Sequence, residues 1–169
     1  MNIVLIGYRG TGKSLIGGLL AERLGMPYIG MDGAIVERAG ISIPEIVAQR
    51  GWPGFRDLES EVARELAGRD NLIIDTGGGV IERPENIEVL QRNARIFWLT
   101  ASVETIVARI AGGTDRPALT SGKTFTEEVA EVLKRRTPLY RSAARHEIGT
   151  DGLTPEEIVT RIEELWRQG

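Results

Sequence analysis

The stretch at residues 7–14, GYRGTGKS, constrains the fold of this chain more than any other feature. It matches G-x-x-x-x-G-K-[S/T], a pattern in which backbone N–H groups of a glycine-rich loop point at phosphate oxygens. The apolar run 2–6 predicts a strand before the loop, and the periodic run 13–24 predicts a helix after it, as the pattern requires. We therefore expect a nucleotide site with these contacts: Gly10, Thr11, Gly12, Lys13 and Ser14.

Lys13 and Ser14 have distinct expected roles in that site. Lys13 should reach the β- and γ-phosphates, and Ser14 should bind Mg²⁺. The loop alone does not decide the activity, because GTPases, motor ATPases and small-molecule kinases share it. The chain has no N-K-x-D run for guanine recognition, and 169 residues are too few for a motor ATPase with a separate sensor region. A kinase of a small acceptor is the class that remains.

Apolar and amphipathic stretches alternate along the whole chain. The predicted strands are 2–6, 27–30, 72–75, 95–99 and 147–149. The predicted helices are 13–24, 33–39, 44–50, 54–67, 84–92, 102–110, 125–141 and one that begins at Thr154. We expect Pro138 to kink or end the helix at 125–141. This alternation predicts one domain over residues 1–169, with a three-layer α/β fold and a five-stranded parallel sheet.

Composition excludes several classes of protein. A net charge of −3 argues against a dedicated nucleic-acid binder. The absence of cysteine excludes disulfides and thiolate metal sites, and it is typical of a reducing compartment. No apolar run reaches the length of a membrane span, and the N-terminus lacks the basic region of a signal peptide. We expect a cytoplasmic protein without membrane or nucleic-acid partners.

Ligands of parallel α/β sheets bind at the carboxyl ends of the strands. The predicted strand 72–75 ends on Asp75, and Thr76 and three successive glycines follow it. Three arginines also stand in unusual local settings, beside aromatic residues, glycines or prolines. They are Arg56, Arg116 and Arg136.

Together these motifs resemble the shikimate kinase family over nearly the whole chain. The resemblance rests on residues 7–14, Asp32, the run Phe55-Arg56-x-x-Glu59, Gly77–Gly79, Arg116-Pro117 and Arg136-x-Pro138-Leu139-Tyr140. It implies a P-loop kinase fold and transfer of the γ-phosphate of ATP to the 3-hydroxyl of shikimate, a step of chorismate and aromatic amino-acid biosynthesis. The partners it implies are shikimate and ATP, and we expect a monomer.

The resemblance also implies roles for individual residues. Lys13, Asp32 and Arg116 would be catalytic, with Asp32 acting as a base or only orienting the attacking hydroxyl. Arg116 would also contact the ATP phosphates from a mobile lid at about 112–124. The shikimate-binding segment would cover about 32–61. The implied shikimate contacts are Asp32, Arg56, Gly77, Gly78, Gly79 and Arg136.

The chain departs from the family at the metal site. Shikimate kinases usually carry Asp-x-Asp after the second strand, whereas this chain has Gly30 in place of the first aspartate and keeps Asp32. We expect Asp75 to supply the missing carboxylate, so that Ser14 and Asp75 hold Mg²⁺. The alternative is that Asp75 bonds the backbone of the following loop. Two other functions also remain open, a gluconate kinase-like enzyme and a nucleotide-binding regulatory module without catalysis.

Overall fold

The structure, a computed structural model, describes residues 1–110 and 124–169. Its strands form one sheet in the order β2-β3-β1-β4-β5, and every neighbouring pair is parallel. The strands are β1 (Asn2–Ile6), β2 (Tyr28–Gly30), β3 (Ile73–Asp75), β4 (Ala94–Thr100) and β5 (His146–Gly149). The predicted five-stranded parallel sheet is confirmed. Arg116 and residues 112–123 of the predicted lid lie outside the described part of the chain.

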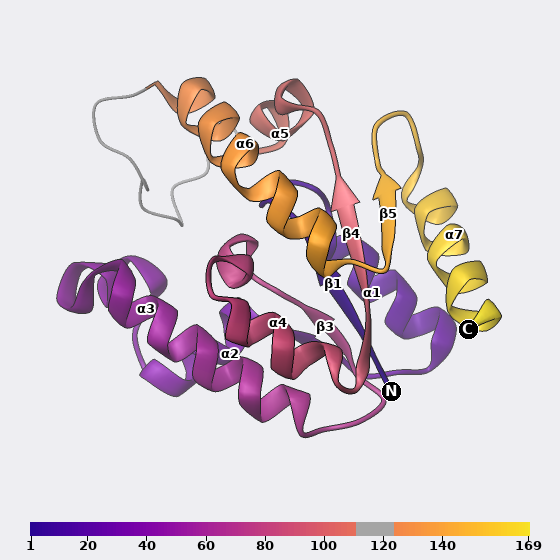
Figure 1. Cartoon of the computed structure of the whole chain (residues 1–169), viewed down its shortest axis with the longest axis horizontal. Helices are drawn as coiled ribbons and strands as arrows, with labels where there is room; N and C mark the ends of the chain where they lie inside the picture. Colours follow the sequence, from indigo (N-terminus) through magenta and orange to yellow (C-terminus); the bar gives the residue numbers. More distant parts are fainter. Residues whose placement is uncertain (111–123) are drawn as a thin grey trace.

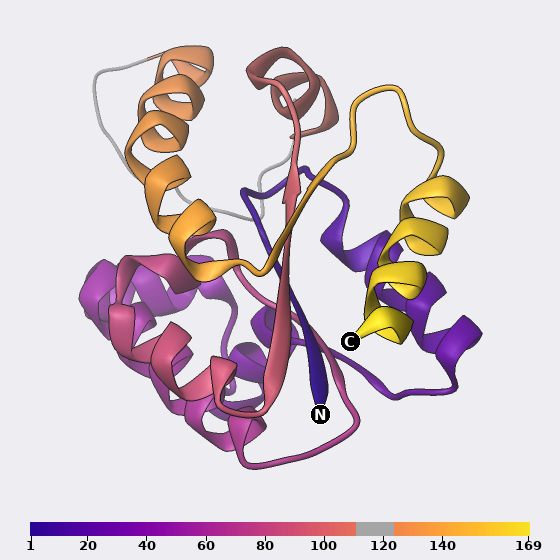
Figure 2. The same cartoon turned by 45° about the vertical axis from the view of Figure 1, so that its right-hand side comes forward.

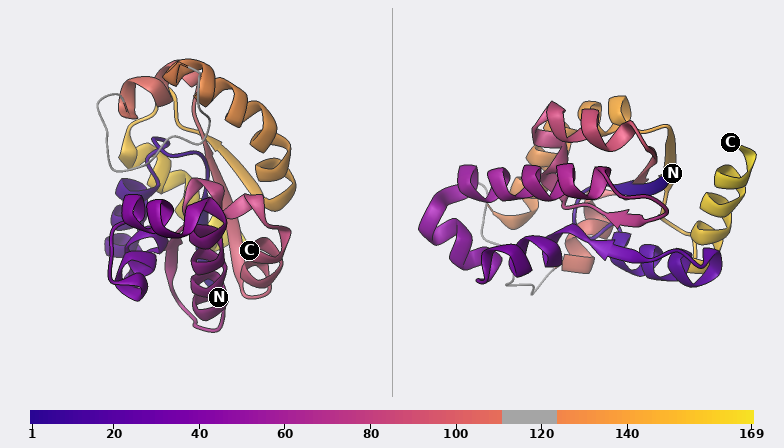
Figure 3. Two further views of the ribbon diagram at one scale, coloured as in Figure 1. Left: turned by 90° about the vertical axis from the view of Figure 1, so that its left-hand side faces the viewer. Right: turned by 90° about the horizontal axis from the view of Figure 1, so that it is seen from below.

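Helices cover both faces of this sheet (Figures 1 and 2). They are α1 (Lys13–Leu24), α2 (Met31–Ala39), α3 (Ile43–Ala67), the 3₁₀ turn η1 (Gly78–Glu82), α4 (Pro84–Gln91), α5 (Val103–Ile110), α6 (Phe125–Ala143) and α7 (Pro155–Gln168). Seen from below, the sheet lies between the two helical layers (Figure 3). The predicted three-layer α/β architecture is therefore confirmed.

Strand β1 separates two apolar cores. Val4 and Ile6 pack into a core with side chains of α2, α3, α4 and α6. Ile3 and Leu5 pack into a second core with side chains of α1 and α7. Successive residues of a strand face opposite sides, so a continuous apolar run is what a strand covered on both faces requires.

Two local features test the predicted helices in detail. The predicted helices 44–50 and 54–67 are confirmed as two helical segments of α3, which is kinked at Gly51, where φ is 70°. That value lies in the left-handed region that glycine adopts without strain. Helix α6 passes through Pro138 without ending and continues to Ala143. None of the helices within residues 1–110 and 124–169 is both long and apolar enough to cross a bilayer.

Candidate active site

The phosphate loop joins β1 to α1 and has the backbone shape that its glycines predict. Gly7, Gly10 and Gly12 have φ values of 145°, 83° and 93°. The Nζ atom of Lys13 donates hydrogen bonds to the carbonyl oxygens of Gly7 at 2.7 Å and Tyr8 at 3.1 Å. Lys13 is 7% exposed, so its ammonium group is fixed within the loop rather than extended into solvent. The loop therefore presents a buried cation and a helix N-terminus at one point, which suits a phosphate group.

Asp75 connects the phosphate loop to strand β2. Its Oδ2 atom accepts a hydrogen bond from Ser14 Oγ at 2.8 Å and another from Tyr28 Oη at 2.6 Å. Burial, and then the hydrogen bond to Asp75, raises the pKa of Tyr28 to about 12, so its hydroxyl stays protonated and donates at neutral pH. These two bonds involve residues far away in the sequence. Within the described residues, the Asp75 carboxylate does not bond the backbone of the loop that follows it. This contradicts the alternative in which Asp75 bonds that loop.

A cavity of about 680 Å³ opens at the carboxyl ends of β1, β2 and β3. Arg109 on α5 forms part of its wall and donates a hydrogen bond to the carbonyl oxygen of Gly10 at 3.0 Å. The predicted site residues that line it are Gly10, Gly12, Lys13, Ser14, Asp32, Asp75, Gly77 and Gly78. One cavity thus joins most of the predicted nucleotide contacts, both predicted metal ligands and three of the predicted acceptor residues.

The three glycines after β3 lie against charged side chains of the protein itself. A Cβ atom added at Gly77 would lie 2.9 Å from Glu59 Oε2 and 3.1 Å from Asp32 Oδ1. One at Gly78 would lie 3.4 Å from Arg136 Nη1, and one at Gly79 would lie 2.2 Å from both Nη atoms of Arg56. Sequence reasoning explained these glycines by the approach of a substrate ring. The structure adds that they also leave room for three of the predicted acceptor side chains.

Arg56 is buried in α3 among partners that fix its guanidinium group. Its Nη1 atom is 3.0 Å from Oε1 of Glu59, one helical turn further along, and Glu59 is completely buried. The guanidinium also lies 5.3 Å from the ring centres of Trp52 and Phe55. A cation held by one carboxylate and two aromatic rings keeps its direction, which suits recognition of a planar anion.

Arg136 occupies a corresponding position on α6. Its side chain is 4% exposed, and its Nε atom lies 3.2 Å from Oε1 of Glu82 in η1. One turn further along α6, the hydroxyl of Tyr140 donates to the carbonyl oxygen of Gly78. Helix α6 is therefore joined to the glycine turn by a side chain on each side of Pro138. Arg56, Arg136 and Gly79 are not among the described residues that line the 680 Å³ cavity.

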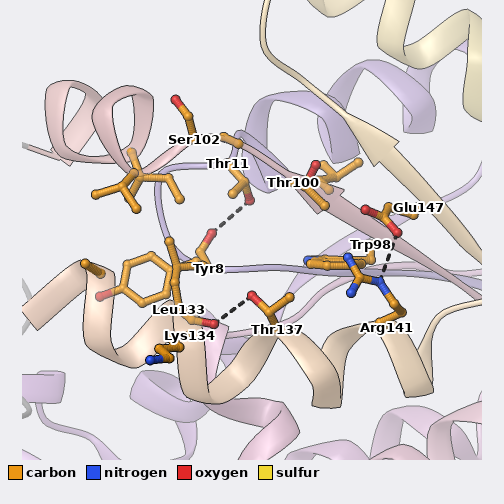
Figure 4. Close-up of a pocket in the computed structure, with 15 residues that line it drawn as sticks. Tyr8, Thr11, Trp98, Thr100, Ser102, Leu133, Lys134, Thr137, Arg141 and Glu147 are labelled. Atoms are coloured by element: carbon orange, nitrogen blue, oxygen red, sulfur yellow. Dashed lines mark hydrogen bonds and ion pairs between the residues drawn. The ribbon is translucent and has the colours of Figure 1, made fainter.

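A second cavity, of about 420 Å³, lies behind the phosphate loop between β4, α5 and α6 (Figure 4). Trp98 forms one wall, and Arg141 lies over its ring and pairs with Glu147 at 3.5 Å. Thr11 donates a hydrogen bond to the carbonyl oxygen of Tyr8 at this edge of the loop. Among the described lining residues, Thr11 alone belongs to the predicted site, so this cavity is separate from the acceptor residues.

Sequence reasoning missed two residues that hold the site together. Tyr28 bonds Asp75, and Glu82 pairs with Arg136. The sequence contains no indication of the role of Glu82, because a glutamate beside other charged residues predicts a solvated surface side chain. A weak signal for Tyr28 existed in Gly17, since glycine in a helix interior is unfavourable unless something packs closely there.

Comparison of the sequence with known proteins identifies a family. A sequence model described as shikimate kinase matches residues 9–166. A curated shikimate kinase of Nitratidesulfovibrio vulgaris is 42% identical over 152 residues, which cover 88% of this chain and 86% of the relative. A shikimate kinase of Geobacter sulfurreducens is 42% identical over 167 residues, covering 99% of this chain and 91% of the relative.

Solved structures agree with the sequence relatives. A shikimate kinase from Acinetobacter baumannii in complex with shikimate superimposes with a TM-score of 0.94 at 34% identity. The match covers 99% of this chain and 93% of that one. A shikimate kinase from Bacteroides thetaiotaomicron superimposes with a TM-score of 0.87 at 29% identity, covering 99% and 98% of the two chains.

Proposed function

The chain belongs to the shikimate kinase family, and we propose that it transfers the γ-phosphate of ATP to the 3-hydroxyl of shikimate. The products would be shikimate 3-phosphate and ADP, in chorismate and aromatic amino-acid biosynthesis. One observation carries the proposal beyond the family match. Asp32, Arg136 and Arg56 lie against three successive glycines at the same end of the sheet as the phosphate loop.

The acceptor would be held by its carboxylate and its hydroxyls. Arg56 and Arg136 would bind the carboxylate, because a planar guanidinium matches it in a bidentate pair. Glu59 and Glu82 would orient these two arginines through the ion pairs at 3.0 and 3.2 Å. Asp32 would accept hydrogen bonds from the ring hydroxyls, and Gly77–Gly79 would let the ring approach the backbone.

Transfer would depend on positive charge placed around the phosphates. Lys13, held at the base of the cavity by two loop carbonyls, would contact the β- and γ-phosphates. Gly10, Thr11 and Gly12 would contribute backbone N–H groups. Asp32 would receive the proton of the attacking hydroxyl or orient that hydroxyl. Arg116 would stabilise the transferring phosphoryl group from the predicted lid, although it lies outside the described residues.

Mg²⁺ would be held by Ser14 and Asp75. A hydroxyl and a carboxylate 2.8 Å apart are hard oxygen ligands at the edge of the phosphate loop, which fits an ion that retains waters and binds phosphate oxygens. The described residues contain no cluster of three or more histidine, cysteine or acidic side chains fit for a metal. A bound Mg²⁺ would neutralise charge on the β- and γ-phosphates. Ser14 and Asp75 thus suit a metal that arrives with the phosphates of the nucleotide.

The proposed function is tested by ADP release from Mg·ATP, measured with shikimate, with gluconate and without an acceptor. We expect strong stimulation by shikimate alone. Stimulation by gluconate instead would assign the chain to another small-molecule kinase activity. ATP binding without stimulation by either acceptor would favour a regulatory module.

A further inference from the structure

Tyr28 makes a contact that no other part of the proposed mechanism uses. Its hydroxyl donates to Oδ2 of Asp75 at 2.6 Å, within the range of a charge-assisted O–H···O⁻ bond. Ser14 donates to the same oxygen at 2.8 Å. Within the described residues, both donors bond Oδ2, and Oδ1 receives neither of them. The two bonds therefore fix the rotation of the carboxylate and leave its second oxygen for another partner.

Two glycines leave the space that Tyr28 occupies. A Cβ atom at Gly17, in the middle of α1, would lie 2.6 and 2.9 Å from the Cε2 and Cδ2 atoms of the Tyr28 ring. A Cβ atom at Gly30 would lie 3.2 Å from the Tyr28 hydroxyl. Gly30 is also the direct neighbour of Asp75 across the β2–β3 pair. The phenol ring is thus fitted between helix α1 and the end of β2, with its hydroxyl above Gly30.

This packing makes a side chain at position 30 and the hydroxyl of Tyr28 compete for space. The Cβ atom of an aspartate at position 30 would crowd the hydroxyl that now fixes Asp75 and force a small shift of it. With glycine there, Tyr28 reaches the Asp75 carboxylate directly. The side chain of Tyr28 therefore links the glycine at position 30 to the orientation of the Asp75 carboxylate.

We propose that Tyr28 is a positioning residue for the metal site: it fixes the Asp75 carboxylate, so that Oδ1, which receives neither of these hydrogen bonds, would be available to a hydrated Mg²⁺ beside Ser14. This inference rests on the proposed role of Asp75 in binding Mg²⁺. It explains how a site with Gly30 retains an ordered carboxylate without a second acidic side chain. Gly17 and Gly30 belong to the same device, since each gives Tyr28 the room it needs.

The test is binding of Mn²⁺, used in place of Mg²⁺, in the presence of ADP. Free Mn²⁺ is measured by electron paramagnetic resonance for the unmodified protein, Tyr28→Phe, Asp75→Asn and the double variant. Tyr28→Phe keeps the ring against Gly17 and removes only the hydroxyl. We expect it to weaken Mn²⁺ binding by about tenfold, as loss of a partner to a metal ligand does. In the double variant the Tyr28 change should add nothing to the effect of Asp75→Asn.

Two further variants make the result specific. Tyr140→Phe removes a different tyrosine hydroxyl, a buried one that bonds Gly78 rather than Asp75, and should leave the Mn²⁺ affinity unchanged. Gly30→Ala should weaken binding in the same direction as Tyr28→Phe, because its methyl group crowds the hydroxyl and shifts it relative to Asp75. If melting curves show that Tyr28→Phe does not fold, Gly30→Ala tests the same contact in its place.

The outcomes separate this inference from the proposals beneath it. Unchanged Mn²⁺ affinity in folded Tyr28→Phe, with weakened affinity in Asp75→Asn, would overturn the role of Tyr28 alone. Unchanged affinity in Asp75→Asn would overturn the metal role of Asp75 and the inference with it. Neither result would decide the proposed kinase activity, because that proposal is tested separately by shikimate-stimulated ADP release.

Discussion

Gly79 and Arg56 are in such close contact that no side chain fits between them. A Cβ atom on Gly79 would lie 2.2 Å from Nη1 and Nη2 and 2.3 Å from Cζ of the arginine. Arg56 cannot move aside freely, because Glu59 and two aromatic rings surround the guanidinium. The position of this cation therefore depends on the absence of a side chain more than twenty residues away.

Gly79→Ala should weaken shikimate binding selectively. We expect the KM for shikimate to rise on the order of tenfold, which corresponds to loss of one hydrogen bond to a charged group. The KM for ATP should change less than about twofold, because the phosphate loop is untouched. Gly18→Ala is the matched control, since a Cβ atom there meets nothing within 4 Å. Equal effects of both substitutions on shikimate would contradict the contact.

Glu59→Gln should destabilise the protein strongly. It leaves the Arg56 cation without its carboxylate at a site where Glu59 is 0% exposed, and breaking a buried pair in this way costs about 3 kcal/mol. Urea unfolding measures the change in the free energy of unfolding. The control is Glu61→Gln on the same helix, whose partner Arg38 lies 3.4 Å away at the surface. That pair should contribute less than about 1 kcal/mol, so similar losses in the two variants would refute the argument.

Asp75→Asn should change the dependence on Mg²⁺ more than the affinity for shikimate. We expect the Mg²⁺ concentration for half-maximal rate to rise by about tenfold, because an amide is a poorer ligand for this ion than a carboxylate. The shikimate KM should stay within about twofold. Steady-state rates at varied Mg²⁺ with saturating ATP give both values. An unchanged Mg²⁺ requirement would remove Asp75 from the metal site.

The three tyrosines of the chain should ionise late and together stabilise the protein below pH 10. Burial raises the pKa of Tyr8, and it raises the pKa of Tyr28 and Tyr140 to about 12. Because the folded-state values exceed the unfolded value of about 10, this stabilisation is complete below pH 10 and is lost as the pH rises toward 12.

Tyrosinate absorbance followed against pH, together with circular dichroism, checks this prediction. We expect little tyrosinate near pH 10 and a rise that accompanies alkaline unfolding. A tyrosine that ionises near pH 10 in the folded protein would contradict the raised pKa expected for that residue. Tyr140→Phe identifies the contribution of one buried group.

Much of the site follows from local sequence, because its parts are at the ends of strands. The phosphate loop, Asp32, Asp75 and Gly77–Gly79 all lie where a parallel sheet places its ligands, and the cavity brings most of them together. The sheet was predictable for the same reason, since apolar runs covered on both faces have few alternatives.

The contacts between distant segments were not predictable. The pairing of Tyr28 with Asp75 spans 47 residues, and that of Arg136 with Glu82 spans 54. A tyrosine or a glutamate in the sequence does not by itself reveal whether its side chain pairs with a site residue or lies free on the surface. Pro138 does not end α6, because the helix packs against the sheet and η1 and continues despite the lost backbone bond.

The two apolar cores divided by β1 have a consequence for how this protein can diversify. The phosphate loop continues into α1, which packs in the core shared with α7. The acceptor residues come from α2, α3, η1 and α6, and the apolar side chains of α2, α3 and η1, with Tyr140 of α6, pack in the other core. The first half of α6 is the exception, because Val129 and Val132 pack with Tyr8 of the phosphate loop. Substitutions that reshape one core therefore have little need of compensation in the other. Selection, or a protein engineer, can therefore change the acceptor residues of α2, α3 and η1 and keep the nucleotide half, whereas changes in α6 must preserve its packing against Tyr8.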